Sequence, residues 1–280
     1  MLRLTGLYVY PVKSCRGLAV TSAGVDARGF AGDRRFLIVD HDGRFLTQRT
    51  HPRLALIETT LTADRLILSA PGLGSVSTPR FSPLDPRPST VPVMIWHDTV
   101  RADDCGDEPA AWLGGFLGLS CRLVRAGAAY ARPIPARKIP DPLSGGVAEG
   151  RGVSHEVSFA DGFPFLIMAE ESLADLNARL DAALPMNRFR PNLVVAGGAP
   201  YAEDTWTRFR IGDVIFHGAT RCSRCVVTTT DQLTADRAPE PLRTLATYRR
   251  DADGSVMFGR NLLHETKTGR VTIGDVVTLL

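Results

Sequence analysis

The feature that most constrains the fold of this chain is its series of short extended runs, each bounded by turn-forming residues. Residues 34–40 (RRFLIVD) and 44–49 (RFLTQR) flank the Asp-Gly pair Asp42 and Gly43. Asp-Gly between two extended runs is one of the strongest short-range signals for a β-hairpin. Further runs of strand length are RLILSA (65–70), VPVMIWH (91–97), TVRAD (99–103), CRLVRA (121–126), NLVVAG (192–197), RIGDVIFHG (210–218), CVVTTT (225–230) and VTIGDVVTLL (271–280). We therefore predict a mainly β protein with a few helices, in the α+β class.

Two segments carry a helical pattern instead. Residues 172–184 place four leucines on one face, begin with Ser172 and Asp175 at the spacing of a capping box, and are followed by Pro185. A shorter helix is predicted over residues 108–118 (EPAAWLGGFLG).

Composition indicates a globular protein with a substantial core. The chain has 280 residues, of which 44% are hydrophobic and 22% charged, enough for one large or two ordinary domains. Residues 125–158 are rich in Gly, Pro and Ala and show no sustained period, which is typical of a linker or a long loop. We therefore predict an N-terminal β domain over residues 1–124, a linker over 125–158 and a second β domain over 159–280.

Charge and hydropathy exclude several classes of partner and location. A net charge of +3 is too small to indicate a nucleic-acid surface. No run approaches the 18 or so apolar residues that span a membrane, and the first residues do not resemble a signal peptide. We expect a cytoplasmic protein without a membrane partner. Its five cysteines, an odd number, are expected to be reduced thiols.

The segment RCSRC, with Cys222 and Cys225, carries the most specific chemistry in the chain. A structural zinc site needs two further ligands at regular spacing, and the sequence offers neither a second CxxC nor an HxxxH pattern. A thioredoxin-like pair lies at the start of a helix, whereas VVTTT favours a strand. Two small buried thiols remain an alternative. The neighbouring Arg221 and Arg224 favour a thiolate. The more specific hypothesis is therefore that one of the two cysteines is a reactive thiolate, which acts as a nucleophile or as a soft metal ligand.

The predicted strand also bears on whether the two thiols cooperate. If a strand begins near Cys222, side chains three residues apart point to opposite faces of the sheet. We therefore expect that Cys222 and Cys225 do not share a site, and that one is functional and the other structural.

Three other short segments carry groups suited to binding an anion. YPVKSCRG offers an ammonium and a hydroxyl, GDRRF offers a guanidinium at the start of a strand, and NRFRPN offers an arginine beside an amide. Taken singly, each segment also fits an ordinary surface loop. The candidate side chains are Lys13, Ser14, Arg34, Arg190 and Asn192.

Taken together and in order, these segments resemble a known family. YPVKSC, GDRRF, FADGFPFLIMAEESLADLNARL, FRPNLVV, RCSRCVVTTTD and VMFGRNL follow one another as in the MOSC family, in its two-part form. Within that family the chain is similar to the mitochondrial amidoxime-reducing component and its bacterial relatives. The resemblance runs along nearly the whole chain and implies a MOSC β-barrel domain packed with an N-terminal β-barrel-like domain.

The resemblance also implies a cofactor and a set of residues that hold it. The second cysteine of CSRC is the family's protein ligand for molybdenum, which corresponds to Cys225, and the remaining ligands would come from a molybdopterin (the molybdenum cofactor) and from oxo or hydroxo groups. The positions that hold the pterin and its phosphate correspond to Lys13, Ser14, Arg34, Arg190, Asn192, Ser223 and Arg224. Cys222 becomes a structural neighbour.

The chain departs from the family pattern at two places near the expected site. Gly162 and Phe163 stand where a small hydroxyl residue is expected, and Asn261 stands where a tyrosine is expected. Asn261 is therefore predicted to lie beside the cofactor or the substrate. Because both departures fall in this region, the family's substrate range is not carried over.

The activity implied is an oxidoreductase that removes oxygen from small N-hydroxylated substrates, such as amidoximes, hydroxylamines and N-hydroxylated bases, by oxygen-atom transfer to molybdenum. Cys225 is then the catalytic metal ligand. The chain ends without a four-cysteine cluster pattern, so an external donor protein of the ferredoxin, flavodoxin or cytochrome/reductase type is expected. The alternative is a carrier of the molybdenum cofactor or of sulfur, of the cofactor sulfurase type, without catalysis of its own.

Overall fold

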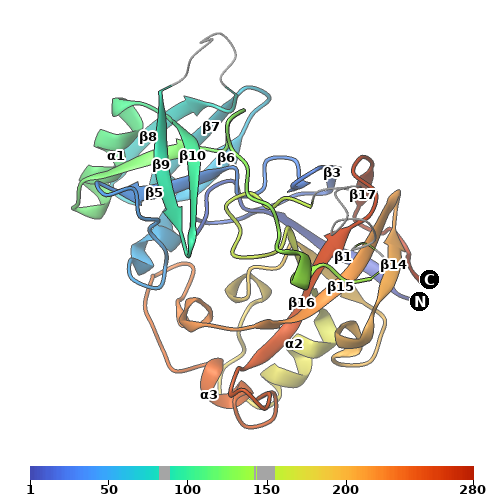
Figure 1. Ribbon diagram of the computed structural model, residues 1–280. Coiled ribbons are helices and arrows are strands. Elements are labelled where there is room, and N and C mark those ends of the chain that lie inside the picture. Colours follow the sequence, from blue (N-terminus) through green and yellow to red (C-terminus); the bar gives the residue numbers. More distant parts are fainter. Residues whose placement is uncertain (82–88, 142, 144–154) are drawn as a thin grey trace.

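The computed structural model describes residues 1–81, 89–141, 143 and 155–280. This part of the chain is mainly β, as predicted, with three α-helices among eighteen strands (Figure 1). The helices are α1 (Asp107–Leu117), α2 (Glu170–Asn177) and α3 (Leu242–Leu245). No helix in the described part has the length and apolar character needed to cross a lipid bilayer.

The largest sheet has eight strands and carries most of the C-terminal half. Its order is β18 (Val277–Leu279), β14 (Arg208–Ile211), β15 (Val214–Ser223), β16 (Met257–His264), β12 (Phe165–Ala169), β13 (Leu193–Ala196), β1 (Arg3–Val9) and β2 (Leu18–Ala19). Alternate residues of these strands are buried in one core, in which the rings of Phe165 and Phe216 meet edge to face with centroids 5.2 Å apart.

The first strands of the chain pair with strands of the C-terminal half and not with those of the N-terminal half. β1 pairs antiparallel with β13 in the eight-stranded sheet, and β3 (Ser22–Asp26) pairs antiparallel with β17 (Arg270–Thr272) in a separate small sheet. The chain then crosses to the other half, so the loops that follow β1 and precede β5 lie at the junction. The division at residues 125–158 stays a prediction, and its residues 142 and 144–154 lie outside the described part.

The N-terminal half is built from two smaller sheets and α1. One sheet has the order β5 (Phe36–Asp40), β11 (Cys121–Arg125), β10 (Asp98–Asp104) and β9 (Thr90–Ile95), and the other has β6 (Glu58–Leu61), β7 (Arg65–Ala70) and β8 (Leu73–Pro79). The third small sheet, β17–β3–β4, includes β4 (Gly29–Phe30). The hairpin turn predicted at Asp42 and Gly43 is confirmed: Gly43 adopts φ 76° and Val39 forms a bridge with Phe45.

The helix predicted over residues 108–118 is confirmed as α1, but the prediction for residues 172–184 is partly wrong. α2 begins at Glu170 and ends at Asn177, and Ser172 is no N-cap, because its hydroxyl donates to the buried carboxylate of Glu203. The side chain of Asn177 donates to the Leu184 carbonyl and accepts from the Leu184 amide, at 3.1 and 2.9 Å. The Asn177 side chain thus satisfies backbone groups of a loop that runs to Leu184, where the prediction had further helical turns.

Candidate functional site

All nine residues predicted for the site line one cavity of about 160 Å³ at the junction of the two halves. They come from the loop after β1, the loop before β5, the segment before β13, the end of β15, the residues after it and the strand β16. In chain order they are Lys13, Ser14, Arg34, Arg190, Asn192, Ser223, Arg224, Cys225 and Asn261. Segments up to about 250 residues apart in sequence therefore meet at one place, as an anion site built from several loops requires.

A buried carboxylate, Asp33, ties these segments together. Its oxygens accept hydrogen bonds from the Tyr10 amide at 2.8 Å, from Asn192 Nδ2 at 3.1 Å and from Arg34 Nη1 at 2.7 Å. Arg34 Nη1 also donates to Asn192 Oδ1 at 2.9 Å, and Asn192 Nδ2 donates to the Tyr8 carbonyl at 3.1 Å. The network joins the end of β1 to the residues before β13, so it sets the position of one wall of the cavity.

Tyr10 packs against two of the cavity's arginines. The guanidinium carbons of Arg34 and Arg190 each lie 4.4 Å from the centroid of its ring. The electron-rich face of an aromatic ring attracts such cations, which allows two like charges to approach one another. Burial raises the pKa of Tyr10 above its usual value, although both arginines oppose this shift, and its hydroxyl donates to the Pro191 carbonyl at 2.9 Å.

Three cavity residues have left-handed backbone conformations that L side chains rarely adopt. The φ angles are 67° at Ser14, 47° at Arg34 and 57° at Arg190. Each such residue costs on the order of 1–3 kcal/mol and persists only where the surrounding structure determines it. At Arg34 the determining contacts include its own amide, which donates to the Tyr10 carbonyl. Strain of this kind is concentrated at functional sites.

Arg49 and Asp161 also line the cavity, and sequence reasoning does not find them. Asp161 accepts from Lys13 Nζ through one oxygen and from Arg49 Nη2 at 3.0 Å through the other. Burial by itself would raise the pKa of Asp161, but the two cations outweigh it and hold that pKa below the usual range. Burial lowers the pKa of Lys13 in spite of Asp161. The side chain of Asp161 nevertheless keeps 51% of its surface exposed, so the ionised carboxylate is accessible from solvent.

Two arginines of the cavity have no carboxylate partner among the described residues. Arg190 donates to the Gln232 side-chain oxygen at 3.3 Å, and burial lowers its pKa to about 10. Arg224 donates to the Phe189 carbonyl at 2.6 Å and to Cys222 Sγ at 3.0 Å, while its buried Nε has no partner in this part of the chain. A partly buried cation without an anion carries a desolvation cost, so the cavity is suited to a negatively charged ligand.

The cysteine segment differs from its prediction. β15 ends at Ser223, and residues 226–229 form a 3₁₀ turn (Val226–Thr229) with Cys225 directly before it, so the strand predicted over 225–230 is wrong. The hydroxyls of Thr228 and Thr229 donate to carbonyls three residues earlier, at 3.0 and 2.7 Å, which stabilises the turn against the β propensity of VVTT.

Because the strand ends between them, Cys222 and Cys225 both line the cavity, and the expectation that they lie on opposite faces is wrong. Both are free thiols. Cys222 accepts a hydrogen bond from Arg224 and packs at the edge of a core cluster with Phe189 and Phe258. Cys225 is close to Arg49: burial alone would lower the pKa of Arg49, but Asp161 and Cys225 together raise it.

The two departures from the family pattern both lie at this cavity. Asn261 lines it from β16 and donates to the Thr220 hydroxyl at 3.2 Å. Gly162 and Phe163 line it from the segment before β12. Asn261 and Phe163 therefore contribute an amide and an aromatic ring to the lining of the cavity that Cys225 also lines.

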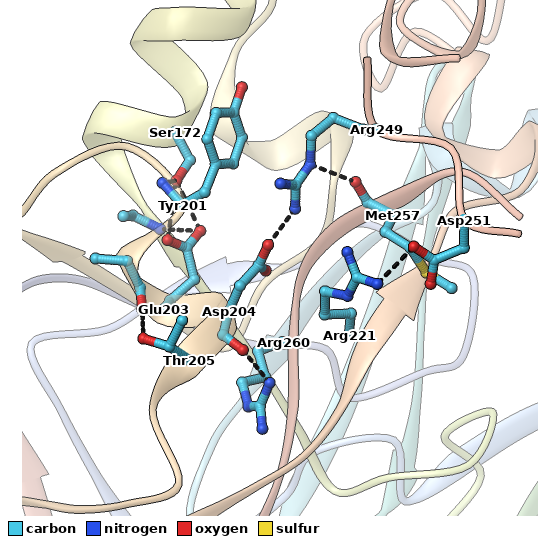
Figure 2. A network of polar contacts seen from close by, with 12 residues as sticks. Ser172, Tyr201, Glu203, Asp204, Thr205, Arg221, Arg249, Asp251, Met257 and Arg260 are labelled. Atoms are coloured by element: carbon cyan, nitrogen blue, oxygen red, sulfur yellow. Dashed lines mark hydrogen bonds and ion pairs between the residues drawn. The ribbon is translucent and has the colours of Figure 1, made fainter. Parts of the chain in front are cut away.

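A polar network near β15 and β16 anchors residues adjacent to those of the cavity (Figure 2). Arg260, next to Asn261, donates to the Asp204 carbonyl, and Arg249 pairs with the Asp204 carboxylate. Arg221, next to Cys222, pairs with Asp251 at 2.5 Å. Neighbouring residues on a strand point to opposite faces, so this network holds the strands whose other side chains face the cavity.

Comparison with known proteins identifies related chains along nearly the full length. Residues 1–120 match the family described as "MOSC N-terminal beta barrel domain", and residues 154–278 match the family described as "MOSC domain". The mouse protein named mitochondrial amidoxime-reducing component 1 is 35% identical over 98% of this chain and 81% of its own length. The bovine mitochondrial amidoxime reducing component 2 is 36% identical over 87% of this chain and 71% of its own. A zebrafish molybdenum cofactor sulfurase is 31% identical over 94% of this chain but 32% of its own length.

The packing of Tyr10 generates a first prediction. A Cβ added at Gly17 would lie 2.3 Å from Tyr10 Cε1, so Gly17→Ala must displace the ring that packs against Arg34 and Arg190. We expect a loss of about 1–3 kcal/mol in the free energy of unfolding, measured by urea denaturation. The matched control is Gly74→Ala, where no atom lies within 4 Å and the change stays within about 0.5 kcal/mol. Equal stability of the two variants would contradict the packing.

The unpaired arginines generate a second prediction. Pyrophosphate, titrated at constant ionic strength, is expected to raise the melting temperature, because an anion bound only by the folded state stabilises it by on the order of 1 kcal/mol at ten times its Kd, or about 2–4 °C. The rise should shrink in Arg190→Gln. It should persist in Arg243→Gln, a control whose exposed guanidinium pairs with Glu240 away from the cavity. An equal rise in all three proteins would place the anion elsewhere.

Proposed function

Because this chain belongs to the MOSC family, as an N-terminal β-barrel domain followed by a MOSC domain, we propose that it binds a molybdenum cofactor and reduces small N-hydroxylated compounds. The observation that carries the proposal is the joint placement of a free thiol, Cys225, and two arginines without carboxylate partners, Arg190 and Arg224, in one cavity of the described part. A thiolate suits a soft metal, and the arginines suit an anionic pterin phosphate.

Different residues of the cavity would bind the metal, the phosphate and the pterin of the cofactor. Cys225 would ligate the metal through its sulfur. Arg190 and Arg224, with Lys13 and Ser14, would bind the phosphate and the polar edge of the pterin, and Ser223 would donate from the end of β15, two residues before Cys225. Arg34 and Asn192, already fixed by Asp33, would orient that edge. When bound, the cofactor supplies a two-electron centre that can accept an oxygen atom from an N–O bond.

Asp161 is the cavity residue that bears most directly on how a substrate would bind. Lys13 and Arg49 keep its carboxylate ionised at neutral pH, so it accepts hydrogen bonds and does not donate a proton. Amidoximes and hydroxylamines present N–H and O–H donors, and an amidine product is a cation. We propose that Asp161 orients these donors toward Cys225 and that Asn261 contacts the same substrate from β16.

Electrons are proposed to come from a separate donor protein of the ferredoxin, flavodoxin or cytochrome/reductase type. The cytoplasmic location expected from the sequence stays a prediction.

A second candidate function is that of a carrier for the cofactor or for sulfur. The observation that favours it is Cys222, a second free thiol in the same cavity, together with the zebrafish relative named as a cofactor sulfurase. In this reading the cations hold the cofactor for delivery, and a cysteine carries sulfur.

Metal analysis tests the role of Cys225. Protein made in a host that synthesises the cofactor is expected to hold about one molybdenum per chain, because a cysteine sulfur and several cations converge on one cavity. Cys225→Ala should lose the metal, and the matched control Cys222→Ala should retain it. Retention of molybdenum in Cys225→Ala would contradict the assignment.

Turnover separates the two candidate functions. Molybdenum-loaded protein is expected to reduce benzamidoxime and 6-hydroxylaminopurine with dithionite-reduced viologen as electron source. Loaded protein that reduces no N-hydroxylated compound would favour the carrier.

A further inference from the structure

Trp96 stands in an unusual place for a tryptophan. It is the first residue of the two-residue turn between β9 and β10, since Ile95 pairs with Asp98, and its φ is 57°. Turns of this kind favour Asn, Asp or Gly, which tolerate positive φ, whereas a bulky side chain there is strained. Trp96 is also 46% exposed. Strain of this kind persists only where the surrounding structure determines it, and it is concentrated at functional sites.

The turn brings Trp96 to the edge of the cavity. Its indole Nε1 donates to Asp161 Oδ1 at 3.4 Å, and the guanidinium carbon of Arg49 lies 4.7 Å from its ring. Arg49 and Asp161 both line the cavity. The β9–β10 hairpin extends from the N-terminal half toward the segment that follows β15 (Figure 1). The indole of Trp96, from the N-terminal half, therefore borders a cavity whose thiol, Cys225, comes from the C-terminal half.

A second aromatic ring, that of Phe45, packs against Trp96. The ring of Phe45 is tilted by 59° against that of Trp96, with centroids 5.1 Å apart, and Lys13 Nζ lies 5.8 Å from the Phe45 centroid. Phe45 belongs to the short hairpin that begins at β5 and leads to Arg49. Trp96 is thus held in place by ring contact, by a cation and by a hydrogen bond, while nearly half of its surface stays open.

We propose that Trp96 is a specificity-determining residue that selects N-hydroxylated substrates whose reacting group is attached to a planar aromatic or heteroaromatic ring. The inference rests on the proposed reductase function and names the substrate class of that site. A flat ring stacks on the exposed indole, while the N–H and O–H donors of its amidoxime or hydroxylamino group reach the Asp161 carboxylate beside it. An aliphatic amidoxime keeps the contact with Asp161 but has no ring to stack.

The test compares two substrates with the same reacting group, benzamidoxime and acetamidoxime, by calorimetric binding to molybdenum-loaded protein without a reductant. Wild-type protein is expected to prefer benzamidoxime. In Trp96→Leu, which retains apolar bulk but no ring, this preference should fall roughly two- to twelve-fold, the range expected for one aromatic contact. Trp96→Phe should retain most of it, and Trp112→Leu, which changes a tryptophan on α1, should retain all of it.

Turnover measured on the same proteins separates this inference from the proposed function. If the inference holds, Trp96→Leu raises the KM for benzamidoxime and leaves both kinetic constants for acetamidoxime near those of the wild type. An equal loss for both substrates would show that Trp96 acts only by holding Arg49 and Asp161, and would overturn the inference, as would a wild type without aromatic preference. Binding with the expected preference but without turnover would contradict the reductase and leave the specificity intact.

Discussion

The buried carboxylate of Asp33 is the interaction on which the site depends. Removing a charge from water is costly unless partners replace the solvent, and Asp33 gathers three: a backbone amide at the end of β1, the amide of Asn192 and the guanidinium of Arg34. Since Asn192 lies 159 residues from Asp33 in sequence, satisfying one carboxylate brings two distant segments together. The pairing of β1 with β13 supplies the frame in which this occurs. Without that frame the anion-binding residues would be separate loops.

The electrostatics of the cavity follow from this assembly. Five cations and one carboxylate line it in the described part of the chain, and Tyr10 separates two of the cations by lying against both. Asp161 pairs with Lys13 and Arg49, whereas Arg190 and Arg224 are left with neutral partners. The cavity therefore combines two cations that lack an anion with a carboxylate that can accept hydrogen bonds from donors. Cys225 belongs to this same cavity.

The residues predicted from the sequence lie together at one cavity, whereas parts of the local structure around it were predicted wrongly. The mainly β class and the hairpin at Gly43 followed from local patterns, whereas the joint location of Lys13, Arg34 and Arg190 was implied by the resemblance to the MOSC family. Arg49, Asp161 and Trp96 were missed because each matters through partners distant in sequence, which no local pattern encodes. The strand predicted after Cys225 was wrong because threonine hydroxyls stabilise a 3₁₀ turn there, and the second helix stops early because Asn177 closes a loop. Both errors arise where a side chain hydrogen-bonds to nearby backbone and so overrides propensity.

The central claim is that Cys225 is the protein's ligand to a molybdenum bound in this cavity, and the most direct measurement is X-ray absorption at the molybdenum edge of the loaded protein. The account predicts one sulfur ligand more than the dithiolene of the cofactor contributes, unchanged in Cys222→Ala. A molybdenum centre with dithiolene sulfur alone would contradict it.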